Sequence, residues 1–190
     1  MPLITTLAGA STRGYGGLKT FGVPNSYESI ETVYLSSGSQ ATITFSSIPA
    51  TYTHLQLRGF SKAASVGDVN FRFNGDSNSN YSRHYSYGNG VSATGAGSST
   101  NSAEGYVGYQ ASGTYFSGVI MDILDYRNTN KYKNTRTFEG TDTNNVGDGI
   151  IMFNSSCWQS TAAITSISLT HGAGNFSQYT HYALYGIKGA

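Results

Sequence analysis

Charged side chains are scarce in this 190-residue chain. They make up 11% of it, against roughly 25% in an average soluble domain. Eleven Lys and Arg residues against ten Asp and Glu residues leave a net charge of +1. A dedicated nucleic-acid-binding protein needs a cationic surface that neutralises phosphates. The charge balance therefore argues against nucleic acid as a partner.

Cysteine and long apolar runs are lacking as well. Cys157 is the single cysteine, which excludes an intrachain disulfide and a multi-cysteine zinc site. Its position beside Trp158 predicts a buried, unreactive thiol. Apolar runs such as Val119-Ile120-Met121 are far shorter than a membrane span requires. The N-terminus also has neither the basic nor the apolar region of a secretory signal, so we expect no membrane association and no such signal.

Hydroxyl, amide and glycine residues are abundant instead, and aromatic residues make up 13% of the chain. The hydrophobic share of 38% is too high for a disordered chain, and the length fits one domain. Helical periodicity is nearly absent. Short runs of Thr, Val, Ile, Tyr and Phe are separated by Gly, Asn, Asp and Ser, which is the pattern of strands and turns. The sequence therefore predicts an all-β protein.

About ten strands are predicted, and the apolar segment 115–126 has the character of a central strand. Short turns without helical crossovers favour antiparallel pairing. A two-sheet sandwich with jelly-roll-like connections is the natural way to close such a set of strands. The predicted strands cover residues 29–35, 40–46, 52–62, 69–73, 81–87, 115–126, 131–139, 149–158, 164–171 and 181–188.

Two segments depart from this pattern. Residues 88–113 are rich in Gly and Ser and predict a long loop, or an excursion with one weak edge strand. Residues 1–28 predict an extended N-terminal arm preceding a sandwich of residues 29–190. A frayed terminus is the alternative. The arm hypothesis rests on four bulky residues interleaved with glycine, which we expect to dock on a partner: Leu7, Tyr15, Leu18 and Phe21.

No convincing catalytic set is present. The Gly-x-Ser-x-Gly sequence of a nucleophile elbow is absent, and so is the His-Glu-x-x-His sequence of a zinc site. Asp122 and Asp125 lie three residues apart on a predicted strand and should face opposite sides. His54 and His84 are predicted on outer strand faces. We therefore expect neither enzymatic activity nor a cofactor.

The segment 74–81 contains alternating oxygen-bearing side chains. Asp76, Asn78 and Asn80 resemble part of a calcium loop, but the glycine and the distal Glu of an EF-hand are missing. Asn and Asp also favour tight turns, where their side chains bind nearby backbone amides. These three residues are only a weak metal candidate. A turn between strands is the favoured interpretation, and no bound metal is expected.

Tyrosines alternate along the predicted strand 81–87. Tyr81, Tyr85 and Tyr87 share one face with Arg83. Such a stripe can stack on sugar rings and serve as a glycan contact. It can also bury rings against a partner chain while keeping the hydroxyls paired, or form the rim of the sandwich core. The sequence leaves these three interpretations open.

Several segments of the chain together resemble a known family. They are the segment 41–59, which reads ATITFSSIPATYTHLQLRG, the segment 69–82 around VNFRFNGD and NYS, and the C-terminal HYALYGIK of residues 181–188. Residues 7–18, LAGASTRGYGGL, add an N-terminal match. These segments are similar to a family of virion structural proteins of tailed bacteriophages. The family includes capsid decoration (cement) proteins, head fibres and tail fibres. The resemblance covers most of the chain and is poorest at residues 88–113.

This resemblance implies a jelly-roll sandwich that is made in the bacterial cytoplasm and assembles on the virion as a homo-oligomer, for which we expect a trimer. The main functional expectation is a cement protein on the outer capsid surface, bound to the major capsid protein and to copies of itself, with the arm reaching across capsid subunits. The alternative is a tail-fibre domain that recognises a host surface glycan.

Overall fold

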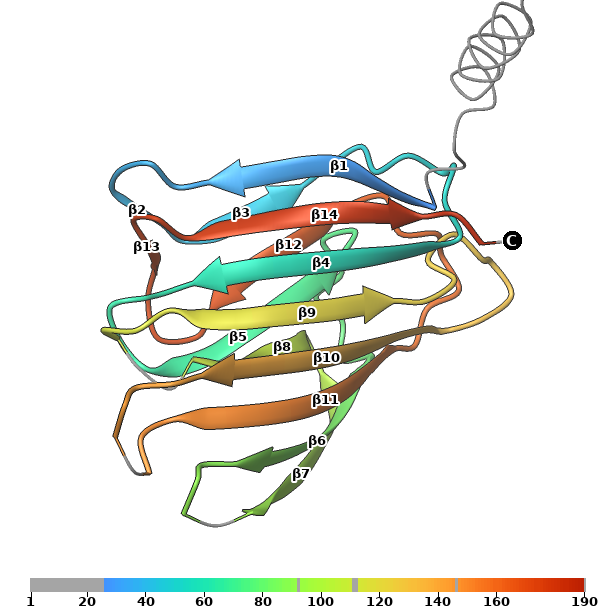
Figure 1. Ribbon diagram of the computed structural model, residues 1–190. Helices are drawn as coiled ribbons and strands as arrows, with labels where there is room; N and C mark the ends of the chain where they lie inside the picture. The colour runs from blue at the N-terminus through green and yellow to red at the C-terminus, as the bar shows by residue number, and fades with distance from the viewer. Residues whose placement is uncertain (1–25, 92, 111–112, 146, 190) are drawn as a thin grey trace, which may run out of the picture.

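The protein is described by a computed structural model that covers residues 26–91, 93–110, 113–145 and 147–189 (Figure 1). These residues form fourteen strands and no helix. Accordingly, none of the described segments is a helix long and apolar enough to cross a membrane. The predicted residues of the N-terminal arm, which are Leu7, Tyr15, Leu18 and Phe21, lie outside the described residues.

Eight strands form the larger sheet, which faces the viewer in Figure 1. They are β1 (Tyr27–Tyr34), β4 (His54–Ser61), β6 (Tyr81–Gly88), β7 (Ala93–Ser102), β9 (Ser117–Ile123), β10 (Lys133–Thr141), β11 (Ile150–Trp158) and β14 (His181–Ile187). Their order in the sheet is β1-β14-β4-β9-β10-β11-β6-β7, and every neighbouring pair is antiparallel. The predicted central strand, β9, indeed lies in the middle of this sheet.

A second antiparallel sheet packs behind the first. It contains β3 (Thr42–Phe45), β5 (Gly67–Phe73), β8 (Gly105–Gln110) and β12 (Ile167–His171), in the order β3-β12-β5-β8. The short strands β2 (Ser39–Gln40) and β13 (Phe176–Ser177) pair with each other. The predicted antiparallel, jelly-roll-like sandwich is confirmed.

Alternation along the strands builds the core between the two sheets. In β4, Leu55 and Leu57 are fully buried, whereas Arg58 faces outward. In the opposite layer, β5 buries Val69 and Phe71, and β12 buries Leu169. Each large apolar side chain that is buried in this way contributes about 1.5–3 kcal/mol to folding.

Residues 88–113 are a correction to the sequence prediction of a long loop. Most of this segment is strand: β7 closes one edge of the larger sheet, and β8 closes one edge of the smaller sheet. β7 is built of small residues with little intrinsic strand preference. Pairing with β6 supplies its conformation, and this tertiary contact is invisible in local composition.

β10 and β11 reverse the usual polarity of a strand in a sandwich. On β10, Thr135, Thr137 and Glu139 point inward and are buried, whereas Phe138 is 43% exposed on the outer face. On β11, Asn154 and Ser156 are buried, while Phe153 is exposed. Buried polar groups require hydrogen-bond partners, and β8 provides them for Glu139, Asn154 and Ser156, as described below.

Lys133, at the start of β10, is fully buried despite its charge. Its Nζ donates hydrogen bonds to the carbonyl oxygens of Asn128 at 2.5 Å, Lys131 at 2.8 Å and Thr161 at 3.2 Å. One ammonium group thus joins the β9–β10 turn to the segment that follows β11. A buried charge is tolerated only where it is hydrogen-bonded in this way.

Replacing Lys133 by methionine tests this connection. Lys133→Met keeps the length of the side chain but leaves three carbonyl oxygens without their donor, so we expect a loss of about 2–4 kcal/mol in the free energy of unfolding. Lys131→Met is the matched control, because it removes only an exposed ion pair with Asp125 and should cost far less. Urea denaturation followed by circular dichroism measures both, and equal losses would contradict the prediction.

Candidate functional site

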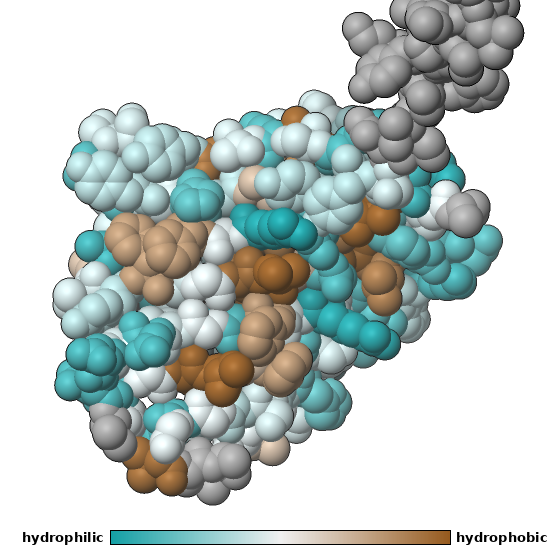
Figure 2. Space-filling view, in the orientation of Figure 1, coloured by the Kyte–Doolittle hydropathy of each residue, from teal (hydrophilic) through white to brown (hydrophobic). Residues whose placement is uncertain are grey.

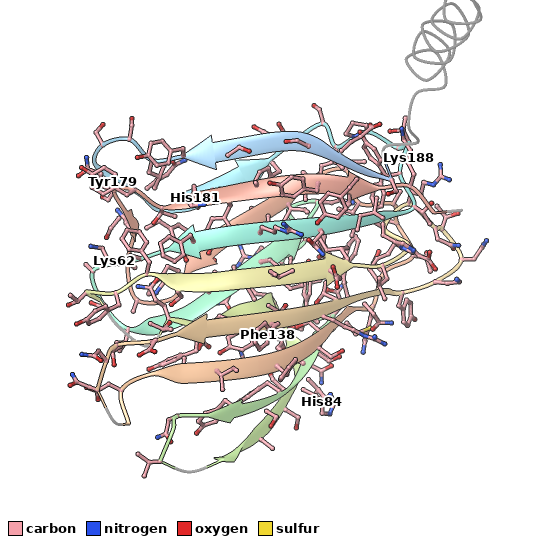
Figure 3. The ribbon with its side chains drawn as sticks, in the orientation of Figure 1. Lys62, His84, Phe138, Tyr179, His181 and Lys188 are labelled. Carbon is pink, nitrogen blue, oxygen red and sulfur yellow. The ribbon has the colours of Figure 1, made fainter. Side chains whose placement is uncertain are left out.

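The outer face of the larger sheet carries a cluster of exposed apolar side chains, which we call the apolar patch. It consists of Ile120, Phe138, Ile151 and Phe153, which are 41%, 43%, 51% and 64% exposed. The sheet register places Ile120 of β9 opposite Phe138 of β10, and Phe138 opposite Phe153 of β11. Figure 2 shows apolar side chains gathered over the middle of this face, and Figure 3 places Phe138 there.

Aromatic contact organises the patch. The ring centroids of Phe138 and Phe153 are 4.8 Å apart, with planes tilted by 35°, a favourable arrangement for two aromatic rings. Beside the patch, Gln56 donates to Asp122 at 2.7 Å and Arg58 donates to Gln56 at 2.7 Å, whereas Phe60, farther along β4, is a further exposed ring. The patch therefore has polar groups at its border, as protein interfaces do.

Behind the patch, inward side chains bind the backbone of β8. Asn154 donates to the Tyr106 carbonyl oxygen at 2.5 Å, and Ser156 accepts from the Tyr106 amide at 3.3 Å. Glu139 accepts a hydrogen bond from the Tyr109 amide at 2.6 Å. These bonds cross from the larger sheet to the smaller one, so the polar inner faces of β10 and β11 fix the position of β8.

Glu139 is the most perturbed carboxyl of this layer. Burial raises its pKa to about 8, even though the hydrogen bond from the Tyr109 amide works in the opposite direction. The charge of Asp68 adds to the increase. Glu139 is therefore mostly protonated at neutral pH, and the interior beneath β8 carries no net charge there.

A second feature lies at the end of the sandwich formed by β6, β8 and β11. It is an open groove of about 320 Å³, which we call the tyrosine groove. Met152 lines the groove together with four tyrosines and an ion pair. These residues are Tyr85, Tyr87, Tyr106, Tyr109, Asp68 and Arg83.

Arg83 is the centre of the tyrosine groove. Its guanidinium carbon lies 4.0 Å from the ring centroid of Tyr106 and 5.5 Å from that of Tyr85, which are cation–π distances. The Arg83 Nη1 atom is also 3.4 Å from the Asp68 carboxylate. Asp68 comes from β5, Arg83 and Tyr85 come from β6, and Tyr106 comes from β8. Folding therefore brings together groups from three strands.

Two of the predicted glycan-contact tyrosines line this groove, and the third does not. Tyr81 is a correction: its ring is fully buried and lies 6.3 Å from that of Trp158, centroid to centroid. Its hydroxyl accepts a hydrogen bond from the Phe73 amide at 3.1 Å, and burial raises its pKa to about 12. The stripe thus begins in the core and opens to solvent only toward Tyr87, because β6 extends past the cover of the smaller sheet.

The weak metal candidate is a hydrogen-bonded turn. The Asp76 carboxylate accepts from the Asn78 amide at 2.9 Å, the Asn80 side chain at 2.8 Å and the Trp158 indole at 2.7 Å. Burial alone would raise the pKa of Asp76, but these hydrogen bonds hold it below its ordinary value. The side-chain nitrogens of Asn78 and Asn80 both donate to Asp76, so this carboxylate organises the turn.

Other chemistry-bearing residues are dispersed. Within residues 26–91, 93–110, 113–145 and 147–189, no group of three or more His, Cys, Asp or Glu side chains could hold a metal ion. His54 accepts from the Asp125 amide, and His84 lies on the outer face near one edge of the sheet (Figure 3). Cys157 is half-buried, and burial raises the pKa of its thiol.

The sequence did not predict three features: the exposed phenylalanines of the apolar patch, the hydrogen bond to Glu139 behind it, and the contact of Arg83 in the tyrosine groove. The exposed phenylalanines of the apolar patch could have been suspected, because Phe138 lies between Thr137 and Glu139 in a strongly alternating strand. The pairing of Glu139 with the Tyr109 amide had no such signal. The same holds for the approach of Arg83 to Tyr106, because β6 and β8 are neighbours only in the folded chain.

Comparisons with known proteins assign no family. No family model and no curated protein matches the chain. Among solved structures, exo-inulinase from Aspergillus awamori is 12% identical, with a TM-score of 0.44 over 84% of this chain and 30% of that chain. The coat protein dimer of Tobacco streak virus is also 12% identical, with a TM-score of 0.18 over 89% of this chain and 90% of that chain. Similarities of this strength carry no argument about function.

The raised pKa of Glu139 predicts a pH-dependent stability. The unfolded carboxyl loses its proton near pH 4.5 and the folded one near pH 8, so the folded state binds more protons between these values. The free energy of unfolding should therefore fall with rising pH across this window, by up to about 1.4 kcal/mol per pH unit. Glu139→Gln, which stays neutral, should flatten this dependence.

Urea denaturation at pH 5, 6.5 and 8 measures the effect. Glu31→Gln is the matched control, because Glu31 is exposed on β1 and its replacement should leave the slope of the parent protein unchanged. A Glu139→Gln variant with the same pH dependence as the parent protein would contradict the prediction.

Proposed function

We propose that the chain is a structural protein of a tailed-phage virion that binds the outer surface of the capsid and stabilises the head. The observation that carries this proposal is the apolar patch, where Phe138 and Phe153 face solvent while Glu139 and Asn154 on the same strands are buried. Large exposed apolar patches mark interaction sites in soluble proteins. The resemblance of the sequence to virion structural proteins supports this proposal, in which the partner is the major capsid protein.

The size of the sheet face fits this role. Eight strands about 4.8 Å apart and about eight residues long form a face of about 34 by 27 Å, or about 900 Å². A specific interface of standard size buries about 800 Å² on each partner. One face of this sandwich is therefore large enough for a stable contact, and several copies around a symmetry axis gain further strength by avidity.

The proposed role is passive. Contact area added at the junctions between capsid subunits resists the outward pressure of packaged DNA, and no reaction is required of the chain. We propose no cofactor, no nucleic-acid partner and no catalysis. Self-association as a homotrimer is part of the proposal and is measured directly by sedimentation equilibrium of the purified protein.

Removing the two patch rings tests the contact with the capsid. The double variant Phe138→Ser and Phe153→Ser should bind at least tenfold more weakly to heads assembled from the major capsid protein of the phage that encodes the chain. The reason is that burying a phenylalanine side chain contributes about 1.5–3 kcal/mol. Co-sedimentation of the purified protein with these heads measures the change.

The matched control removes two equally exposed rings outside the patch, through Tyr132→Ser and Tyr179→Ser. These side chains are 56% and 54% exposed, and Tyr179 lies at the far border of the outer face from Phe138 (Figure 3). The control should bind as the parent protein does. Equal binding by the patch variant and the parent protein would show that another surface makes the contact.

The N-terminal arm is tested separately. Residues 1–28 contain Leu7, Tyr15, Leu18 and Phe21, which we propose to dock on neighbouring capsid subunits. Deleting residues 1–22 leaves β1 intact, since this strand begins at Tyr27, and should weaken co-sedimentation without unfolding the sandwich. Undiminished binding by the truncated protein would contradict the arm hypothesis.

The second candidate function is a receptor-binding domain of a tail fibre that recognises a host surface glycan. The tyrosine groove is the observation that favours it, because aromatic rings beside an ion pair suit sugar recognition. Copy number separates the two functions: hundreds of copies per virion indicate the capsid surface, and tens or fewer indicate the tail. Mass spectrometry of separated heads and tails measures this number.

A further inference from the structure

We propose that the tyrosine groove is a binding site for a neutral sugar in its pyranose form. The inference deepens the second candidate function by naming the site and the ligand class. It does not depend on attachment to the capsid, since the groove and the apolar patch lie on opposite faces of the larger sheet.

The first supporting observation is a platform of two rings. Tyr85 and Tyr87 lie two residues apart on one face of β6, with ring centroids 6.2 Å apart and planes 30° apart. This spacing is comparable with that of successive rings in a linear oligosaccharide. The C–H face of a pyranose packs against such an aromatic surface, while its hydroxyl groups remain at the rim.

The neighbouring strand supports the platform from one side. Tyr87 pairs with Gly95 of β7 and Tyr85 pairs with Gly97. A Cβ at Gly95 would lie 1.5 Å from the Tyr87 ring, and one at Gly97 would lie 2.3 Å from the Tyr85 ring. Both rings therefore rest directly on the β7 backbone. A rigid aromatic surface loses little conformational entropy when a ligand binds.

The second observation is a paired donor and acceptor beside the platform. The Arg83 guanidinium and the Asp68 carboxylate are 3.4 Å apart, and their side chains are 26% and 38% exposed. Each sugar hydroxyl both donates and accepts hydrogen bonds, so adjacent hydroxyls are recognised by a group that donates beside a group that accepts. The stacking of Arg83 on Tyr106 at 4.0 Å fixes the orientation of the guanidinium.

Charge favours a neutral ligand over an anionic one. Arg83 and Asp68 cancel each other, and Glu139 beneath β8 is mostly protonated at neutral pH. A phosphate or carboxylate ligand would gain only one cation and would face Asp68 at the same time. Neutral hydroxyl groups meet no such repulsion.

The dimensions of the groove limit the ligand to a short sugar. Its volume of about 320 Å³ lies at the lower end of the 300–1,000 Å³ range of small-molecule sites. Its lining also includes the apolar side chains of Ile150 and Met152, which suit the C–H edge of a ring. One or two pyranose units fill such a space.

Saturation-transfer NMR on the full chain tests the proposal with glucose, galactose, N-acetylglucosamine and cellobiose, and with glucuronate as an anionic comparison. We expect transfer to at least one neutral sugar and weaker transfer to glucuronate. A titration followed by ¹H–¹⁵N spectra should shift the amide signals of β6 and β8. Tyr87→Ala should weaken the binding at least tenfold, while Tyr87→Phe, which keeps the ring, should stay within threefold.

Tyr132→Ala is the control, since it removes an exposed ring from a distant turn and should bind the sugar unchanged. The proposal is overturned if no neutral sugar shows transfer, if Tyr87→Ala binds as the parent protein does, or if a proline-rich peptide shifts the β6 signals and no sugar does. Capsid co-sedimentation of Tyr87→Ala should be normal, so a failure of sugar binding and a failure of capsid binding are told apart.

Discussion

The hydrogen bonds that cross from β10 and β11 to the backbone of β8 are the interaction on which the rest of the structure depends. Asn154, Ser156 and Glu139 turn polar atoms into the sandwich, and the Asn154 side-chain amide nitrogen, the Ser156 hydroxyl and the Glu139 carboxyl bond to the backbone of β8. A buried polar network of this kind is stabilising only when its members are paired. β8 must therefore stay in place, and with it the wall of the tyrosine groove formed by Tyr106 and Tyr109.

The same strands carry the apolar patch on their other face. Side chains alternate between the two faces of a strand, so β10 places Glu139 inward and Phe138 outward, and β11 places Asn154 inward and Phe153 outward. The inner hydrogen bonds and the outer patch therefore use side chains of the same two strands, β10 and β11. This links the stability of the sandwich to the surface that we propose as its contact with the capsid.

Much of the fold could be predicted from the sequence, because β4 and β5 alternate apolar and polar residues in the ordinary way. β7 could not, because it consists of small residues whose extended conformation comes from pairing with β6. The stripe from Tyr81 to Tyr87 was correctly placed on one face of a strand. Its exposure depends on where the second sheet ends, and local sequence holds no information on that. For the same reason, the contact of Arg83 with Tyr106 was beyond prediction.

The glycines of β7 have a consequence for how this chain can vary. Gly95 and Gly97 lie directly under the rings of Tyr87 and Tyr85, so the two rings pack against the backbone of β7. A residue larger than glycine at either position would push the facing tyrosine ring away from β7. The shape of the tyrosine groove therefore depends on two residues that have no side chain of their own.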